Sequence, residues 1–441
     1  MPRSRTHTLI LGAFAVGLVS AAGAWQAMQS QPPRVEGVVP ALQNAQPRYW
    51  KGNLHTHSFW SDGDDFPEMI ADWYKEHGYH FLALSDHNVL AEGERWLKID
   101  PARPVTQVAT DKYRRRFGSA WVEERRRGEV PEVRLKPLAE YRSLLEEPGR
   151  YLLLPAEEIT HRYAKAPVHI NAINLRDVIK PVDGASVAET IMVNHRLVEE
   201  QARATGWKMI AFLNHPNFGW GIRAEDMIAA DELRFFEVFN GHPGVRNHGD
   251  EKHPSCERLW DIVLALRLGK LRTPVVYGLA TDDAHGYHQF GIGKVNPGRA
   301  WVMVRAPYLS AEAILRGLET GDFYASTGVV LDDVERGPTA LKLRIRPEEG
   351  VSYRTQFIAT LRDASLASEP QRDENGNLLE VTRVYADAIG QVVAESSSLM
   401  PSYQMTGNEL YVRAKVISSK PHPNPYQKGE VEVAWTQPLT P

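Results

Sequence analysis

Histidine and acidic residues that can bind metal ions recur in order through the middle of the chain. The series begins with a His-x-His pair, continues with five single residues and ends with an Asp-x-His pair: His55, His57, Asp62, His87, Glu158, His169, His215, Asp283 and His285. Each lies at or just beyond the end of a predicted strand. Side chains two residues apart on a strand point to the same face, so each pair can bind one ion together. Core packing is a poor explanation for two such pairs and five single residues at strand ends, and the series predicts a metal site.

The residue types limit the metals and the chemistry. Cys256 is the only cysteine, so neither a disulfide within the chain nor a thiolate cluster can form. Imidazole and carboxylate ligands suit Zn, Mn or Fe. Nine ligands exceed what one tetrahedral ion needs, and buried ligands without a partner are costly, so we expect two or three divalent ions. Clustered ions lower the pKa of bound water and clamp attacking and leaving oxygens, which predicts a hydrolase whose nucleophile is a metal-bound hydroxide.

The order H-x-H-x4-D, S-D-H, Glu, His, N-H-P and D-A-H resembles the PHP (polymerase and histidinol phosphatase) metallohydrolase family. The resemblance extends over about residues 51–328 and fills all nine ligand positions of the family. The segment 321–328 and a β-rich tail resemble the branch of that family typified by the carbamate hydrolases CehA and McbA. The resemblance implies a distorted seven-stranded barrel, and it implies that Glu158 bridges metal ions.

Three residues are expected to take part in catalysis, namely Asp86, Glu158 and His215. Asp86 stands directly before a ligand and could orient a histidine from behind the metal site, although capping of the strand end is an equal alternative. Glu158 rather than Glu157 is the expected ligand, because adjacent residues of a strand face opposite sides and only one can enter the barrel.

Other polar residues near these positions are weaker candidates. Glu237 and Asn240 close the predicted strand 235–239, and the family resemblance places similar residues near the site. Four more residues could donate a proton or hold an anionic group, but each is individually more typical of a protein surface: His161, Arg162, His242 and His288. His77 and His80 flank helix and strand ends and are expected to be structural.

Strand and helix patterns alternate through residues 51–328. Pro67 lies in the first turn of a helix predicted over 66–77. Ser186 opens a second helix as part of a capping box, and Gly206 ends it. The ligands follow the strands, as in barrels whose sites lie at the carboxyl ends of the strands. We therefore expect an α/β protein: a distorted (β/α)7 barrel followed by a small antiparallel β domain.

Two segments depart from this alternation. Residues 91–150 are rich in Arg and Glu and are expected to form a mostly helical insertion over or beside the mouth of the site. Their charge is more typical of a solvated helical face than of a phosphate clamp, though long loops near a site are often lids. Residues 329–441 alternate with period two and predict a β-sandwich-like domain. Its only histidine is His422, so we expect it to hold no metal of the catalytic cluster.

The amino-terminal residues suggest export. Residues 1–24 combine a basic start, a short apolar run and an Ala-x-Ala end, the features of a secretory signal peptide. The run is short for a membrane span, although an uncleaved anchor is the alternative. Residues 25–50 are expected to be a linker or an N-terminal wrap. The mature protein would then be periplasmic or secreted, without a stable membrane span.

Composition narrows the function classes. A net charge of −4, with 43% hydrophobic and 24% charged residues, is typical of a soluble globular protein and disfavours binding to extended nucleic acid. We expect a small-molecule ester as substrate. A phosphomonoester or phosphodiester is the first choice, and a carbamate or carboxyl ester is the alternative. A non-catalytic metal- or glycan-binding exported module is the remaining class, and the oligomeric state is left open.

Overall fold

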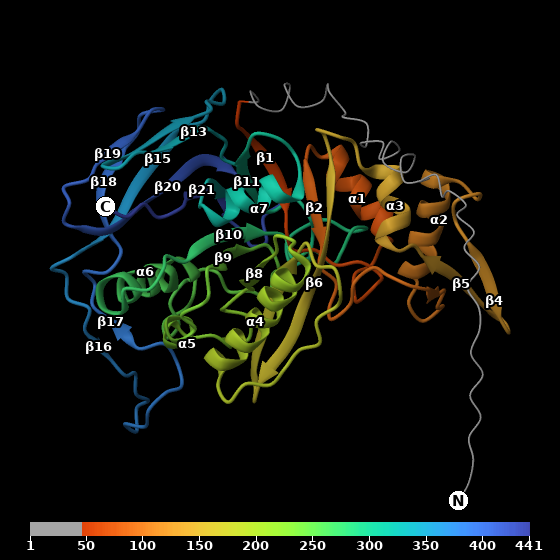
Figure 1. The fold of residues 1–441 in the computed structure, drawn as a ribbon, viewed down its shortest axis with the longest axis horizontal. Coiled ribbons are helices and arrows are strands. Elements are labelled where there is room, and N and C mark those ends of the chain that lie inside the picture. Colours follow the sequence, from red (N-terminus) through yellow and green to blue (C-terminus); the bar gives the residue numbers. More distant parts are fainter. Residues whose placement is uncertain (1–45) are drawn as a thin grey trace, which may run out of the picture. The chain divides into compact units, whose positions relative to one another are not determined.

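A computed structural model describes residues 46–441, of which residues 47–441 form one compact unit. The expected signal peptide at 1–24, and the linker or wrap as far as residue 45, lie outside the described residues (Figure 1). Among the described helices, none is both long enough and apolar enough to cross a membrane.

A mixed sheet of 13 strands is the main element of the fold (Figure 1). From one edge to the other its strands are β10 (Tyr277–Thr281), β9 (Phe235–Asn240), β8 (Ile210–Leu213), β7 (Ala166–Ile173), β6 (Leu152–Tyr163), β2 (Phe81–Leu84), β1 (Arg48–Asn53), β11 (Trp301–Ala306), β12 (Phe323–Ser326), β21 (Val431–Thr436), β20 (Glu409–Pro421), β15 (Tyr353–Leu361) and β18 (Gln391–Ser396).

The strand directions decide where side chains can meet. β1, β2 and β6 run parallel, as do β8, β9 and β10, whereas β7 is antiparallel to both of its neighbours. The hydrogen-bond ladder does not close within the described chain: an isolated bridge between Thr56 and Ala284 links the segments that follow β1 and β10. The distorted (β/α)7 barrel that we expected is therefore not confirmed, and the fold is a mixed α/β structure with a large sheet.

The helices associated with this sheet are α1 (Pro67–Glu76), α4 (Val187–Thr205), α5 (Ala224–Ala229), α6 (Cys256–Leu266), its π-helical continuation η1 (Arg267–Leu271) and α7 (Ala311–Glu319). The structure contains two of the predicted helices, with the residues that we expected at their ends. Pro67 is the first residue of α1, where its missing N–H costs nothing. Ser186 Oγ accepts a hydrogen bond from the Glu189 amide to open α4, and Gly206, with a φ of 71°, ends it.

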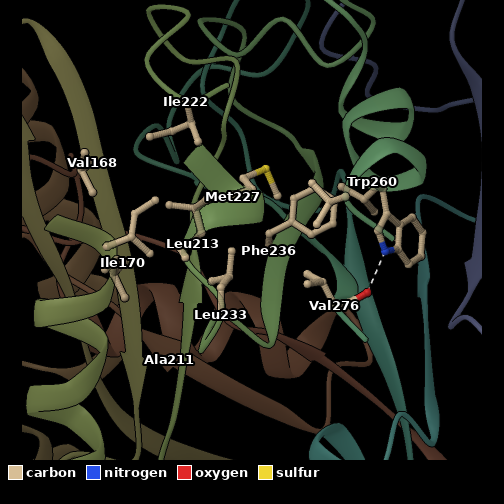
Figure 2. Packing of buried hydrophobic residues seen from close by; sticks show 14 of the residues in the cluster. Val168, Ile170, Ala211, Leu213, Ile222, Met227, Leu233, Phe236, Trp260 and Val276 are labelled. Carbon is tan, nitrogen blue, oxygen red and sulfur yellow. Dashed lines mark hydrogen bonds between the residues drawn. The ribbon is translucent and has the colours of Figure 1, made fainter. Parts of the chain in front are cut away.

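The largest apolar cluster lies between strands β7 to β10 and helices α4 to α6. Figure 2 shows Ile170, Leu213 and Phe236, from three neighbouring strands, packed in a layer that includes Trp260 of α6. A Cβ on Gly278 of β10 would lie 2.9 Å from the Trp260 ring, so the close approach of helix and strand needs glycine at this position. Burying each large apolar side chain contributes about 1.5–3 kcal/mol, and this layer holds the site-bearing strands in place.

The insertion at 91–150 is mixed rather than mostly helical. It contains β3 (Arg95–Lys98), α2 (Val105–Phe117), β4 (Glu124–Arg127), β5 (Val130–Leu135) and α3 (Leu138–Leu145), with the strands paired antiparallel in the order β3-β5-β4. The two Arg runs differ in structure. Arg114, Arg115 and Arg116 lie in the last turn of helix α2, as expected for a solvated helical face, whereas Arg125 of β4 pairs with Glu132 of β5 at 2.7 Å.

The tail is antiparallel, as predicted, but it continues the main sheet. β21 pairs with β12 on one side and with β20 on the other. A smaller sheet pairs β13 (Leu331–Arg336), β14 (Ala340–Ile345) and β19 (Ser402–Gln404), and a two-stranded one pairs β16 (Ser368–Glu369) with β17 (Val384–Tyr385). Arg413 of β20 forms a bidentate, buried ion pair with Asp261 of α6, at 2.8 and 2.7 Å. A separate domain over 329–441 is not confirmed.

Candidate metal centre

The structure brings all nine residues of the predicted series together at one end of the strands. Seven lie in segments that follow parallel strands: His55, His57 and Asp62 after β1, His87 after β2, His215 after β8, and Asp283 and His285 after β10. The other two lie inside strands, Glu158 in β6 and His169 in β7. Because β7 is antiparallel to its neighbours, His169 enters from the first half of its strand. Our expectation of a carboxyl-terminal position is wrong for this residue.

Three groups of these side chains are each compact enough to hold one ion, with the ligand atoms of a group within 4.8 Å of one another. The groups are His57, Asp62, His87 and His285; His55, Glu158 and His215; and His55, His57 and Asp283. Since His55 and His57 each belong to two groups, the three positions are neighbours with shared ligands. His169 stands beside them, with Nδ1 2.8 Å from Oε1 of Glu158.

Two buried carboxylates face the His55–His57 pair. Oδ1 of Asp283 lies 3.2 Å from Nε2 of both histidines, and Oε2 of Glu158 lies 3.6 and 3.5 Å from the same two nitrogens. Glu158 also reaches Nδ1 of His87 at 2.7 Å and Nε2 of His215 at 3.5 Å. One carboxylate therefore touches residues of all three groups, which is the geometry that a bridging ligand needs.

Glu157 faces the other side of the same strand. Its Oε1 accepts a hydrogen bond from the Ile179 amide at 2.6 Å, and burial raises the pKa of Glu157 to about 8. No contact joins it to the nine residues in the described structure. The placement agrees with the choice of Glu158 over Glu157 as the ligand.

Unpartnered polar atoms at the centre of the cluster fit a bound cation. Nε2 of His55 and both ring nitrogens of His57 are buried and have no hydrogen-bond partner. A buried polar atom without a partner costs free energy, and several together in one place need an explanation. Imidazole nitrogens and carboxylate oxygens are the ligands that Zn, Mn and Fe accept, so the residues present fit divalent ions.

The charge states of Glu158 and His57 also fit. Against the cost of burial, the imidazoles of His169 and His55 hold the pKa of Glu158 well below its usual range. Burial and the neighbouring His285 lower the pKa of His57 to about 3. The Glu158 carboxylate is therefore ionised and the His57 ring is neutral, and these are the forms in which the two residue types bind metals.

Asp86 does not orient a histidine, in contrast to one of our expectations. Its carboxylate accepts hydrogen bonds from the amide and hydroxyl of Ser58, at 2.8 and 2.7 Å, and from the Ser61 hydroxyl at 2.6 Å. These three donors use both carboxylate oxygens, so Asp86 ties down the turn between His57 and Asp62. The alternative of a local structural cap describes this residue better.

The weaker candidates divide into two sets. Glu237 contacts the cluster directly, through a 2.6 Å hydrogen bond with His55 Nδ1, and Asn240 donates to Asp283 Oδ2 at 3.1 Å. The His242 ring lies 5.6 Å from that of His285. The other candidates lie away from the cluster. His161 binds Asp183, His288 binds the Asp64 carbonyl, and Arg162 contacts no ligand in the described structure. The two histidines expected to be structural have local partners: His77 stacks on Trp73, and His80 accepts a hydrogen bond from the Lys51 amide.

Phe218 is a neighbour of the site that our sequence reading did not single out. Its ring centroid lies 5.1 Å from that of His215 and 6.2 Å from those of His169 and His242. The side chain is half-buried, so part of it faces solvent beside the ligands. Its place three residues after His215 is the only signal in the sequence, and an aromatic residue in a loop is too common to be informative.

Comparisons with known proteins find similarity among solved structures. No family model and no curated protein matches the chain. Among solved structures, a two-domain protein from Bacteroides vulgatus ATCC 8482, described as containing a predicted PHP-like metal-dependent phosphoesterase, is 14% identical with a TM-score of 0.35, over 89% of this chain and 95% of that one. A protein from Bifidobacterium adolescentis ATCC 15703, provisionally named a metal-dependent phosphoesterase, is 14% identical with a TM-score of 0.28, over 55% and 90%. At such low scores, the assignment of function depends on the site itself.

Proposed function

We propose that this protein is a metal-dependent hydrolase of the PHP type that holds two or three Zn, Mn or Fe ions. The observation that carries the proposal is the convergence of three ligand groups around buried His55 and His57 nitrogens that have no hydrogen-bond partner. Bound divalent ions would supply Lewis acidity and an activated water molecule to attack an ester.

The side chains of the site have distinct tasks in this proposal. Glu158 and Asp283 place negative charge between the histidines, and His57 stays neutral to act as a ligand. Asp62 is the most accessible of the nine, with 55% of its side chain exposed, so its group lies nearest to the entering substrate. Cys256 is no alternative nucleophile, because it is buried and burial raises the pKa of its thiol to about 12.

A phosphomonoester or phosphodiester is the first-choice substrate, because neighbouring ligand groups suit clamping of two oxygens during in-line displacement at phosphorus. A carbamate or carboxyl ester is the alternative, as in the CehA and McbA branch. Two observations favour it. The partly exposed Phe218 ring lies beside the ligands. In the described chain, the nine residues form ion pairs with histidine or acidic side chains, and none of these pairs contains a Lys or Arg that could hold a phosphate.

The test is metal content together with turnover. Purified protein, reconstituted with Zn or Mn, is analysed for bound metal and assayed with mono- and bis-p-nitrophenyl phosphate, naphthyl acetate and a naphthyl methylcarbamate, before and after chelation. We expect two to three equivalents of metal and turnover that chelation abolishes. His169→Ala should lower both, whereas His161→Ala, on the same hairpin but paired with Asp183, should lower neither. One equivalent or none, with no hydrolysis of any substrate, would contradict the proposal.

A further inference from the structure

Glu237 is a fully buried carboxylate that contacts the metal cluster from behind. It lies in β9, between β8 and β10, and each of its two oxygens accepts two hydrogen bonds. Oε1 accepts from His55 Nδ1 and from the Thr281 hydroxyl, each at 2.6 Å. Oε2 accepts from the His215 amide and from Nδ2 of Asn240, each at 2.8 Å. Every hydrogen-bonding direction of this carboxylate is thus occupied by a donor.

We propose that Glu237 is a positioning residue that keeps the proton of His55 on Nδ1 and so leaves Nε2 free to bind an ion. The inference rests on the proposed metal-dependent function and goes beyond it, because Glu237 is none of the nine ligands. A histidine that binds metal through one nitrogen commonly donates its other N–H to a carboxylate, which fixes the tautomer and the orientation of the ring.

The position of His55 makes its tautomer decisive. Its Nε2 lies 3.2 Å from Asp283 Oδ1 and 3.6 Å from Glu158 Oε2, and it has no hydrogen-bond partner. His55 is a member of two of the three ligand groups. A proton on Nε2 would remove the lone pair through which His55 can bind an ion in either group, so the residue that controls this proton controls whether His55 can serve as a ligand.

Glu237 also places two further ligands. It accepts a hydrogen bond from the amide of His215, whose φ is 23°. Asn240, which donates to Glu237, also donates to Asp283, whose φ is 49°. Such backbone conformations are unfavourable for residues other than glycine and persist only where the surroundings hold them. The carboxylate therefore keeps ligands from three different strand ends in register.

The donors around Glu237 predict what a glutamine would do there. The His215 amide can only donate, and Asn240 is oriented by the His242 amide, which donates to its Oδ1 at 2.8 Å. A glutamine oxygen must therefore take the place of Oε2, and its NH2 group must take the place of Oε1. That NH2 group faces Nδ1 of His55, which then has to accept a hydrogen bond and carry its proton on Nε2.

The experiment compares Glu237→Gln with a matched buried substitution, Glu68→Gln. Glu68 is also fully buried, but its donors are Tyr113 and Trp121, away from the cluster. Zn affinity is measured by competition with a chelator, and the ring nitrogens of His55 are observed by 15N NMR in the Zn-loaded protein, with His55→Ala to assign them. We expect wild type and Glu68→Gln to show a protected Nδ1–H on His55. Glu237→Gln should lose this signal and bind Zn about 10- to 100-fold more weakly.

Thr281→Val and the Zn-loaded wild type test the inference independently of Glu237→Gln. Thr281→Val removes one donor to the same oxygen without changing the carboxylate, and should retain the Nδ1–H signal. Zn-loaded wild type with the His55 proton on Nε2 would overturn the inference, even if Glu237→Gln failed to fold. Equal Zn affinity of Glu237→Gln and wild type would overturn it as well. Failure of the wild type to bind any ion would instead contradict the proposed function.

Discussion

Glu68 is a buried carboxyl group whose charge lowers the stability of the protein at neutral pH. It lies in α1, and its Oε1 accepts hydrogen bonds from the Tyr113 hydroxyl at 2.5 Å and from Trp121 Nε1 at 3.2 Å, while Oε2 has no partner. Burial, partly offset by these donors, raises the pKa of Glu68 from 4.5 to about 7. Between these two values the folded state binds more protons than the unfolded state, so stability falls as the pH rises. The folded and unfolded pKa values of Glu68 differ by about 2.5, and each unit of this difference is worth about 1.36 kcal/mol. Ionisation of Glu68 therefore lowers the free energy of unfolding by about 3 kcal/mol at pH 8.

Glu68→Gln reproduces the shape and the neutral charge of the protonated side chain at every pH. We would measure the free energy of unfolding by urea denaturation at pH 5 and at pH 8. The value for Glu68→Gln should exceed that of wild type by at most about 1 kcal/mol at pH 5 and by about 3 kcal/mol at pH 8. Glu76→Gln, at an exposed position of the same helix, serves as the control and should show no such change with pH. A Glu68→Gln effect that is equal at pH 5 and pH 8 would refute the reasoning.

Three further outcomes are expected. Glu158→Gln should lose bound metal by elemental analysis while Glu157→Gln keeps it, and a greater loss from Glu157→Gln would reverse the ligand assignment. Arg413→Met leaves Asp261 charged and buried without its main partner, so it should cost about 3–5 kcal/mol in urea unfolding, and adding Asp261→Leu should restore most of this. Intact-mass analysis of the exported protein should show cleavage after Ala24, and a mature chain that retains its first residue would disprove the signal peptide.

The ligand series was visible in the sequence because it depends on local spacing. His55 and His57 are two residues apart, so any extended backbone puts them on one side. Helix ends were readable for the same reason, since the cap of α4 by Ser186 involves residues three apart. Seven of the nine side chains follow parallel strands, so they converge once these strands lie in one sheet, because the carboxyl ends then meet at one edge.

Strand direction was not readable in this way. An alternating pattern looks the same in both directions, so nothing local distinguishes the antiparallel β7 from a parallel strand, and His169 was placed at the wrong end. Asp86 was misjudged for a related reason. Its neighbour His87 is adjacent in sequence, but its hydrogen-bond donors, Ser58 and Ser61, come from the preceding strand–loop unit.

The contacts of Glu237 and the course of the tail strands depend on long-range pairing. The partners of Glu237 include residues from the segments after β1 and β8 and from the end of β10, and only the folded sheet shows that they surround one carboxylate. Period two predicts that the tail contains strands, but it carries no information about which strand pairs with β12. The change in pattern at residue 329 predicts the antiparallel strands of the tail, but it does not show whether they form a separate domain.

The place of β21 in the sheet has a consequence for biosynthesis. Ala325 of β12 pairs with Trp435 of β21, and Lys415 of β20 pairs with the same residue from the other side. The sheet cannot be completed until residue 436 has been synthesised, and until then β12 and β20 expose unpaired edges that can join other chains. Pairing over so long a stretch of chain is slow to form. Until β21 docks, the chain can therefore pair wrongly with other chains through the free edges of β12 and β20.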